Sequence, residues 1–463
     1  MMLLTACMVF LLLLSWLNIF GFLGIRASLL LLFAFVGRFF LHNLRLEGPI
    51  SYALHNLDIL DLNLLKLLIH DISQNSLPGA VLFSGPQGSG KFSCALEIAR
   101  ILSCTGEKRG HWLCECPSCM QNKALVSQNV LIAGPKDCTP EILAASDTFL
   151  NAVYNNAKYL MAARFLFIRS IRKLTMRFNP VLWQGDDKLS KIAAIISDID
   201  EELEPIDFPH ELPEPEKIEK ACKKLCELTQ KLESSFMYDS IPIAHIRNAS
   251  AWAHLKSSDG KKTIIIENAD RMLESVRNAL LKILEEPPAD TVFVLTTSRR
   301  NAVMPTILSR VRTYSFTERT TEQQQEVINR VFHKETFNGS IDDFLLTYLP
   351  VSPDVLKANS GKFFASIASG HIPEIPGLIK ACGNFDPRIM LKIFLNGMNV
   401  YGRKCMSSPA GAQAAYELTK VQKDCWNNVT VYNQSVNSAL EILVRDIAKI
   451  NKIHGNILKW TVM

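Results

Sequence analysis

The chain has 463 residues, enough for about three domains. Its formal net charge of +5 is mild, so the charge balance permits contact with nucleic acid but does not predict it. Hydrophobic residues make up 48% of the chain, with the excess at the N-terminus, and most of the 12 cysteines are scattered. This spacing excludes a secreted disulfide framework and favours a reducing, cytoplasmic compartment.

Residues 1–43 differ from the rest of the chain. Residues 1–25 and 27–37 carry no charged side chain, and about 20 apolar residues suffice to span a bilayer. No Lys or Arg precedes the first run, so it lacks the basic region of a signal peptide. Two interpretations stay open: a mis-called start, or a membrane anchor that leaves the remainder on the cytoplasmic side.

A phosphate-binding loop is predicted after the first core strand. A helix over residues 57–72 precedes strand 80–83, and a further helix covers residues 94–102. Glycines between this strand and helix let backbone N–H groups turn toward a phosphate at the positive end of the helix, as in a Walker A loop. The residues predicted to bind nucleotide here are Gly85, Gly88, Ser89, Gly90 and Lys91.

One position in this loop argues against magnesium binding. The residue after Lys91 should be Ser or Thr, whose hydroxyl binds Mg²⁺, but it is Phe92. Ser93 follows, and one residue further along a helix points about 100° away. The sequence therefore favours a loop that binds ATP, or that only keeps the shape of such a loop, over a fast ATPase.

Four thiols fall within sixteen positions directly after this helix. Four thiolates satisfy tetrahedral Zn²⁺, and a loop of this size can fold around the metal. His111 is an alternative ligand, and free thiols in a reducing loop are the simpler interpretation. The predicted zinc ligands are Cys104, Cys114, Cys116 and Cys119.

Helical patterns dominate residues 139–240, after a short strand at residues 130–132. Helices are predicted over residues 142–167, 189–202 and 214–236, with acidic, Pro-rich links between them. The region also carries a basic run beside several phenylalanines, and we expect it to be a solvated helix face rather than a nucleic-acid patch. The run consists of Arg164, Arg169, Arg172, Lys173 and Arg177.

Residues 263–316 read as strand, turn, helix, strand, loop, helix and strand. The buried strand 264–266 ends in Glu267, Asn268 and Asp270, where open α/β sheets place ligand chemistry. A helix follows over residues 273–286, and the strand 292–295 ends in a polar run that includes Thr297. The order of these elements is that of a P-loop α/β domain.

Three short motifs characterise this block: Asn278–Lys282, Leu284–Pro288 and Leu308-Ser309-Arg310. In these motifs the block resembles the clamp-loader branch of the AAA+ ATPases, namely the delta-prime and gamma/tau subunits of bacterial DNA polymerase III, although Val311 replaces the family's Cys. It implies an AAA+ parallel-sheet domain of class α/β, with a zinc module, a helical lid and a C-terminal helical collar.

The resemblance also assigns roles to single residues. Arg310 would be presented as an arginine finger to the ATP site of a neighbouring subunit. Thr297 would be the sensor-1 residue, although a strand-capping Thr is an equal alternative. Glu267 would replace the metal-binding Asp, but the catalytic Glu position reads Asn268, which again predicts poor hydrolysis.

The domain plan follows from this order. We expect an AAA+ domain over residues 44–316, with its zinc loop at 104–119 and a helical insertion at 139–240 that exceeds the family's usual pattern. A lid would cover residues 317–385, with helices at 321–332, 342–349 and 353–369. A collar would cover residues 386–463, with helices at 388–401, 412–427 and 436–453.

The function predicted on this basis is that of a delta-prime-type stator, which donates its finger and helps load the sliding clamp on primed DNA. Its partners would be gamma/tau and delta subunits. A catalytic gamma/tau-like ATPase is one alternative, and a membrane-tethered AAA+-like scaffold, which requires residues 1–43 to be genuine, is another.

Overall fold

The computed structural model describes residues 62–107, 110–111, 113–257, 260–335, 337–406, 408–430, 432 and 434–461. The apolar residues 1–43, and the start of the helix expected from residue 57, lie outside these ranges. Within them, no helix is both long and apolar enough to cross a bilayer.

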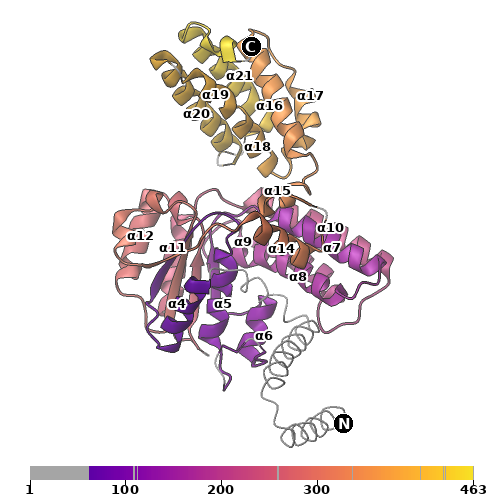
Figure 1. Ribbon diagram of the computed structural model, residues 1–463, viewed down its shortest axis with the longest axis vertical. Helices are drawn as coiled ribbons and strands as arrows, with labels where there is room; N and C mark the ends of the chain where they lie inside the picture. Colours follow the sequence, from indigo (N-terminus) through magenta and orange to yellow (C-terminus); the bar gives the residue numbers. More distant parts are fainter. Residues whose placement is uncertain are drawn as a thin grey trace, which may run out of the picture. The chain divides into compact units, whose positions relative to one another are not determined.

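A parallel five-stranded sheet forms the centre of the nucleotide-binding part of the fold, as expected, with the order β2-β3-β4-β1-β5. Figure 1 labels the helices of the chain, several of which flank this sheet. Strand β1 lies between β4 and β5, so Val81 is paired with both Val294 and Arg312. Every residue of β1 to β4 is buried, which explains the apolar runs at the centre of these strands. The strands are β1 (Ala80–Ser84), β2 (Val130–Ala133), β3 (Lys262–Ile266), β4 (Thr291–Thr297) and β5 (Arg312–Ser315).

Helices cover both faces of the sheet. Alternate side chains of each strand point to opposite faces, so Val81 and Ile265 belong to one core cluster while Leu82 and Ile264 belong to another. The first cluster is shared with α4 and α5, and the second with α11, α12 and the helices after β2. The flanking helices are α4 (Leu62–Ser73), α5 (Lys91–Ser103), α6 (Pro117–Ala124), α11 (Ile243–His254), α12 (Glu274–Glu285) and α13 (Pro305–Leu308).

Four helices between β2 and α11 pack into the second of these clusters. The single helix expected over residues 142–167 is wrong: the chain forms two helices that break at Asn156, whose φ of 44° is left-handed. Asn tolerates this conformation, which commonly ends helices. The helices are α7 (Thr139–Tyr154), α8 (Leu160–Thr175), α9 (Leu189–Leu203) and α10 (Pro215–Phe236).

The basic run of α8 is not a solvated face. Arg164 is 2% exposed, and it donates hydrogen bonds to the backbone oxygens of Ile206 (2.8 Å), Asp207 (2.6 Å) and His210 (2.7 Å). Arg177 is 1% exposed. The other three cations bond to Lys123, Ala124, Asp207 and Glu141 of the same chain. The run therefore ties the helical region together, because buried guanidinium groups need partners.

A buried carboxyl joins α10 to the sheet side of α7. Glu233 Oε2 accepts hydrogen bonds from the backbone N–H groups of Cys138 (2.8 Å) and Thr139 (3.0 Å), which open α7. Burial, together with the charge of Asp137, raises the pKa of Glu233 to about 8 in spite of these two bonds. The anchor is thus a group whose ionised form is disfavoured by its surroundings.

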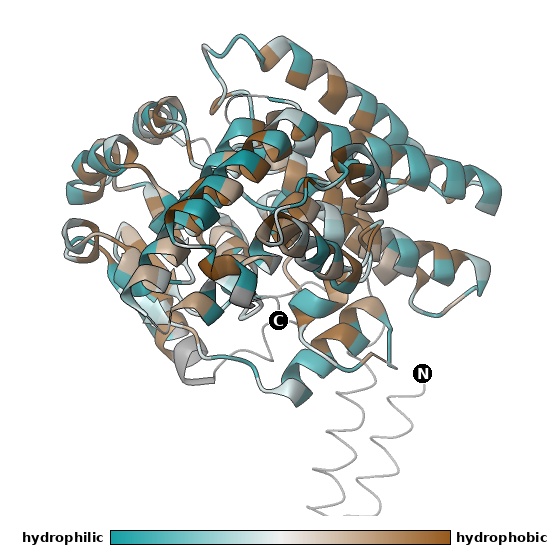
Figure 2. Cartoon of the chain, turned by 90° about the horizontal axis from the view of Figure 1, so that it is seen from above, coloured by the Kyte–Doolittle hydropathy of each residue, from teal (hydrophilic) through white to brown (hydrophobic). Residues whose placement is uncertain are grey.

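Helices also make up the rest of the described chain after β5, and the last of them share a core of their own. Figure 2 shows that helices of the chain carry hydrophobic residues on one side and hydrophilic residues on the other, as amphipathic packing requires. The helix expected over 388–401 is two helices, α18 and α19; Gly397 at the break packs so closely that an added Cβ would stand 2.8 Å from Ser360 Oγ. The helices are α14 (Thr321–Phe332), α15 (Ile341–Leu346), α16 (Pro353–Ala368), α17 (Ile375–Ala381), α18 (Ile389–Gly397), α19 (Asn399–Cys405), α20 (Pro409–Thr430) and α21 (Val436–Ile453).

Replacement of Glu233 by Gln should make the protein less sensitive to pH. A carboxyl whose pKa is raised on folding loses stability as pH rises from its unfolded value to its folded value of about 8. Glu233→Gln keeps an oxygen acceptor without this loss. The variant should therefore gain stability over the wild type between pH 5 and pH 8, on the order of 3 kcal/mol, and no more above that.

Thermal unfolding at a series of pH values measures this difference. Glu227→Gln, at an exposed site on the same helix, is the matched control and should show no such trend. A wild type that gains stability relative to Glu233→Gln as pH rises would contradict the prediction, because the carboxylate would then be the favoured form.

Candidate functional site

The predicted phosphate loop lies between the end of β1 and the start of α5. Gly88 and Gly90 have φ values of 69° and 90°, which side chains other than glycine rarely adopt. Gly85 meets the end of β5, where an added Cβ would stand 2.4 Å from the backbone oxygen of Phe316. The three glycines are therefore required by the backbone of the loop itself.

Lys91 folds back onto the loop. Its Nζ donates to the backbone oxygens of Gly85 (2.7 Å) and Pro86 and lies 3.3 Å from Ser89 Oγ. Burial, and then the charge of Lys136, lower the pKa of Lys91 to about 8. The ammonium group thus lies among the loop carbonyls, in a position from which it can turn toward an anion.

Residues from beyond β5 cover the loop on its outer side. Arg319 donates to the backbone oxygen of Gly88, and Ile341 lies close enough to contact a Cβ at that position. Ser89 is buried, with its Oγ donating to the backbone oxygen of Pro86 (2.8 Å). Groups of its own chain therefore cover part of the loop, while Gln87 and Gly88 stay exposed.

The carboxylate at the end of β3 is held by an arginine from the helical region. Arg177, in the short helix η1 (Met176–Phe178) after α8, donates from Nη2 to Glu267 Oε2, and the two side chains are 1% and 6% exposed. The Arg177 guanidinium also lies over the ring of Phe92, with Cζ 5.1 Å from the ring centre. A fixed positive charge thus lies between the two positions that would hold a magnesium ion.

The next two polar positions are engaged in local structure. Asn268 has a left-handed φ of 54°, and its side chain donates to the backbone oxygen of Pro135 (2.7 Å). Thr297 Oγ1 donates to Asp270 (2.7 Å) and accepts from the backbone N–H of Arg299 (3.0 Å). Asn268 is therefore a turn residue and Thr297 caps its strand, which favours the strand-capping alternative for Thr297.

Arg310 lies at the surface, after the short helix α13. Its guanidinium donates from Nε to Glu285 Oε1 (2.9 Å) and from Nη1 to the backbone oxygen of Thr306 (2.7 Å). The side chains of Arg310 and Glu285 are 31% and 50% exposed. The guanidinium is held in one direction by its own chain and remains accessible to solvent.

The four predicted zinc ligands come together. The Sγ atoms of Cys104, Cys114, Cys116 and Cys119 all lie within 4.8 Å of one another, which fits four thiolates around a metal such as zinc. The short Cys114-Glu115-Cys116 spacing does not prevent this. His111 is not part of the cluster.

The surroundings of the cluster lower the pKa of Cys104 and of Cys116, whereas burial raises the pKa of Cys119. Burial opposes ionisation of Cys116, but hydrogen bonds from the backbone of Cys119 and Thr105 outweigh it and lower the pKa of Cys116 to about 6. Arg100 Nη1 donates to Cys119 Sγ (3.2 Å), which places a positive charge beside the most buried thiol. Deprotonated sulfur is the form that binds zinc.

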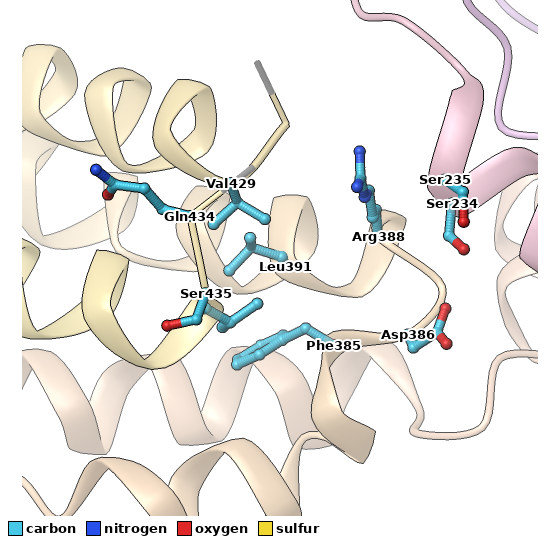
Figure 3. Close-up of a pocket in the computed structure, with 10 residues that line it drawn as sticks. Ser234, Ser235, Phe385, Asp386, Arg388, Leu391, Val429, Gln434 and Ser435 are labelled. Carbon is cyan, nitrogen blue, oxygen red and sulfur yellow. The ribbon is translucent and has the colours of Figure 1, made fainter. Parts of the chain in front are cut away.

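A pocket of about 320 Å³ lies away from these groups, lined by residues of α10 and of the last helices. Figure 3 shows Phe385 and Leu391 on its apolar side, with Asp386 and Arg388 facing Ser234 and Ser235. Its lining includes neither a cysteine nor a histidine. The candidate chemistry therefore lies at the phosphate loop, at Arg310 and at the cysteine cluster.

These elements match the description of a known family. The family model described as "DNA polymerase III, delta subunit" matches residues 61–203 and 210–320, more than half of the chain. The chain belongs to this family. The matched ranges include the phosphate loop, the cysteine cluster and Arg310, and they also extend over most of the helical region 139–240, which does not stand apart from the match.

Curated relatives match over shorter stretches. DNA polymerase III subunit delta' of Bacillus subtilis is 46% identical over 56 residues, which is 12% of this chain and 17% of that protein. Subunit gamma/tau of Mycobacterium bovis is 31% identical over 100 residues, 22% of this chain and 16% of that protein. The chain thus aligns with only about a sixth of these relatives' length, and the matches do not separate delta-prime from gamma/tau.

A solved structure of a DNA polymerase III gamma subunit-related protein from Thermotoga maritima is 15% identical. It covers 49% of this chain and 90% of its own, with a TM-score of 0.24. The assignment of an AAA+ α/β fold to this DNA polymerase III family member rests on the family match and on the parallel sheet.

Two residues that complete the site were not anticipated. The sequence pattern predicts a solvated face for Arg177, and nothing in the sequence indicates its partner 90 residues away. Glu285 lies inside the motif Leu284–Pro288 that carries the family resemblance, so the motif contained a signal for it. The Glu285 carboxylate accepts a hydrogen bond from Arg310 and so helps to orient the guanidinium.

Loss of one cysteine should remove the metal from this family member. Cys119→Ser deletes the most buried of the four thiols, so the zinc content should fall from about one ion per chain toward zero, and the thermal midpoint should fall with it. Elemental analysis and thermal unfolding measure the two effects. Cys226→Ser, at a half-buried thiol of α10, is the control and should keep the zinc. Full zinc occupancy in Cys119→Ser would contradict the assignment.

Proposed function

We propose that this chain is a stator-type, delta-prime-like subunit of a clamp loader, which supplies Arg310 to ATP held by a neighbouring subunit. The proposal rests on the contrast between the chain's own phosphate loop, whose carboxylate is occupied, and Arg310, which is accessible to a partner. The chain's own metal-binding carboxylate, Glu267, is paired internally with Arg177, whereas Arg310 lies accessible at the surface.

The contacts of Arg310 are compatible with a guanidinium that binds ATP on a neighbouring subunit. An ion pair at this degree of exposure is worth about 1 kcal/mol or less, so phosphate oxygens can replace Glu285 at little cost. The bond to Thr306 keeps the guanidinium pointing in one direction. A guanidinium delivered in this way stabilises charge on a transferred phosphoryl group.

The chain's own loop is a poor catalyst by the same reasoning. Hydrolysis needs a metal ligand and a group that orients water. Here Phe92 offers no hydroxyl, and Asn268 is engaged with Pro135. This argues against the catalytic gamma/tau-like alternative, although the loop keeps the shape that binds phosphates.

The remaining assignments belong to the same proposal. Residues 44–316 would form the AAA+ domain, residues 317–385 the lid and residues 386–463 the collar. Arg319 and Ile341, which cover the phosphate loop, support the lid assignment. Gamma/tau and delta subunits would be the direct partners, and the sliding clamp and primed DNA would be met through the complex. The cysteine cluster would hold zinc in a structural role.

Substitution of Arg310 should reduce ATP hydrolysis by the assembled complex. In a complex of the full chain with gamma/tau and delta subunits, Arg310→Ala should lower the clamp- and DNA-stimulated rate at the neighbouring site that Arg310 serves by about 10³-fold, because that site loses its finger. Lys91→Ala should change the rate by less than about twofold.

Arg300→Ala is the matched control, because Arg300 is an exposed arginine in the short helix η4 (Arg300–Ala302), just before α13. It should leave the rate unchanged. If Lys91→Ala is instead the damaging substitution and Arg310→Ala is mild, the chain is a working ATPase and the stator assignment is wrong.

A further inference from the structure

The position of Arg177 suggests what kind of ligand the phosphate loop takes. Its Nη2 is bonded to Glu267 at the end of β3, and its Nη1 donates to the backbone oxygen of Lys173. Both side chains of the ion pair are almost completely buried. Removal of one partner from such a pair leaves an uncompensated buried charge, so a metal ion cannot easily displace the guanidinium.

The other metal-binding position is closed as well. Phe92 offers a ring where a hydroxyl would bind the metal, and the Arg177 guanidinium lies 5.1 Å from its centre. The interaction between a cation and an aromatic face is attractive. The two residues at the positions that would hold Mg²⁺ thus both contact Arg177. Glu267 does so through its charge and Phe92 through its aromatic ring.

The groups that bind phosphate remain. α5 begins at Lys91, so its free backbone N–H groups point into the loop formed by Gly88 and Gly90. Among the described residues, the hydrogen bonds of Lys91 go to oxygens of the loop itself. Glu267 lies close enough to Lys91 for its charge to act on that ammonium group, so Arg177, Glu267 and Lys91 form one charged cluster.

We propose that this loop binds the phosphates of a nucleoside di- or triphosphate without a divalent cation, with Arg177 as the built-in positive charge in the place of the metal. The proposal rests on the proposed function, because a stator retains a loop for binding rather than for hydrolysis. A bound nucleotide would then be a lasting structural ligand of this subunit.

Titration of the full chain with ATP, in excess EDTA and in excess Mg²⁺, tests the proposal. The wild type should bind ATP with dissociation constants that agree within about threefold in the two conditions. Arg177→Gln removes one charge from the cluster, so its binding in EDTA should weaken by about tenfold while Mg²⁺ restores part of it. Arg177→Lys keeps the charge and should remain independent of metal.

Arg172→Gln is the matched control. Arg172 lies on α8 and is paired with Asp207, away from the loop, so its substitution should not change the ratio of the two constants. Lys91→Ala should abolish binding in EDTA, and retained binding would overturn the location of the site.

Two results with the wild type alone overturn the proposal: ATP binding that is more than about tenfold tighter with Mg²⁺, or no ATP binding in either condition. These results hold even if Arg177→Gln fails to fold. Neither affects the stator function, which is measured separately through Arg310 and the neighbour's ATP hydrolysis.

Discussion

The ion pair between Arg177 and Glu267 is the interaction on which the rest of the molecule depends. Glu267 directly follows β3, a central strand of the sheet, and Arg177 lies in the short helix η1 after α8, so their contact fixes the helical region against the carboxyl edge of the sheet. The same contact occupies the carboxylate that a metal would need. One buried interaction thus determines both how two parts of the fold are joined and what chemistry the loop can perform.

The sheet and both candidate sites could be predicted from the sequence because their signals are local. The phosphate loop and the four cysteines lie within short stretches, and the strands contain apolar runs. The basic run of α8 could not be interpreted in this way. Arg164 finds its oxygens more than 40 residues away, and charged residues at helical spacing have the same pattern on a solvated face as on a buried one.

The helix boundaries failed for a different reason. Apolar periodicity continues across Asn156 and across Gly397, so it predicted one helix where the chain forms two. Asn156 is exposed and ends its helix in a left-handed conformation, which is a local feature that apolar periodicity does not register. Gly397 permits a close approach to Ser360, which is a requirement of tertiary packing. The motif singles out Arg310 as a candidate residue in the sequence. Its contact with Glu285 becomes visible only in the structure, where α12 and α13 lie side by side.

Helix α5 connects the phosphate loop directly to the cysteine cluster. It begins at Lys91 in the phosphate loop and ends at Ser103, immediately before the first zinc ligand, Cys104. A helix of 13 residues is about 20 Å long and transmits displacement as a stiff rod. A metal at one end and an anion at the other, if this chain binds them as proposed, would therefore act on the same rigid body. Thermodynamic reciprocity then requires that whatever the metal does to the affinity for phosphate, phosphate does equally to the affinity for metal.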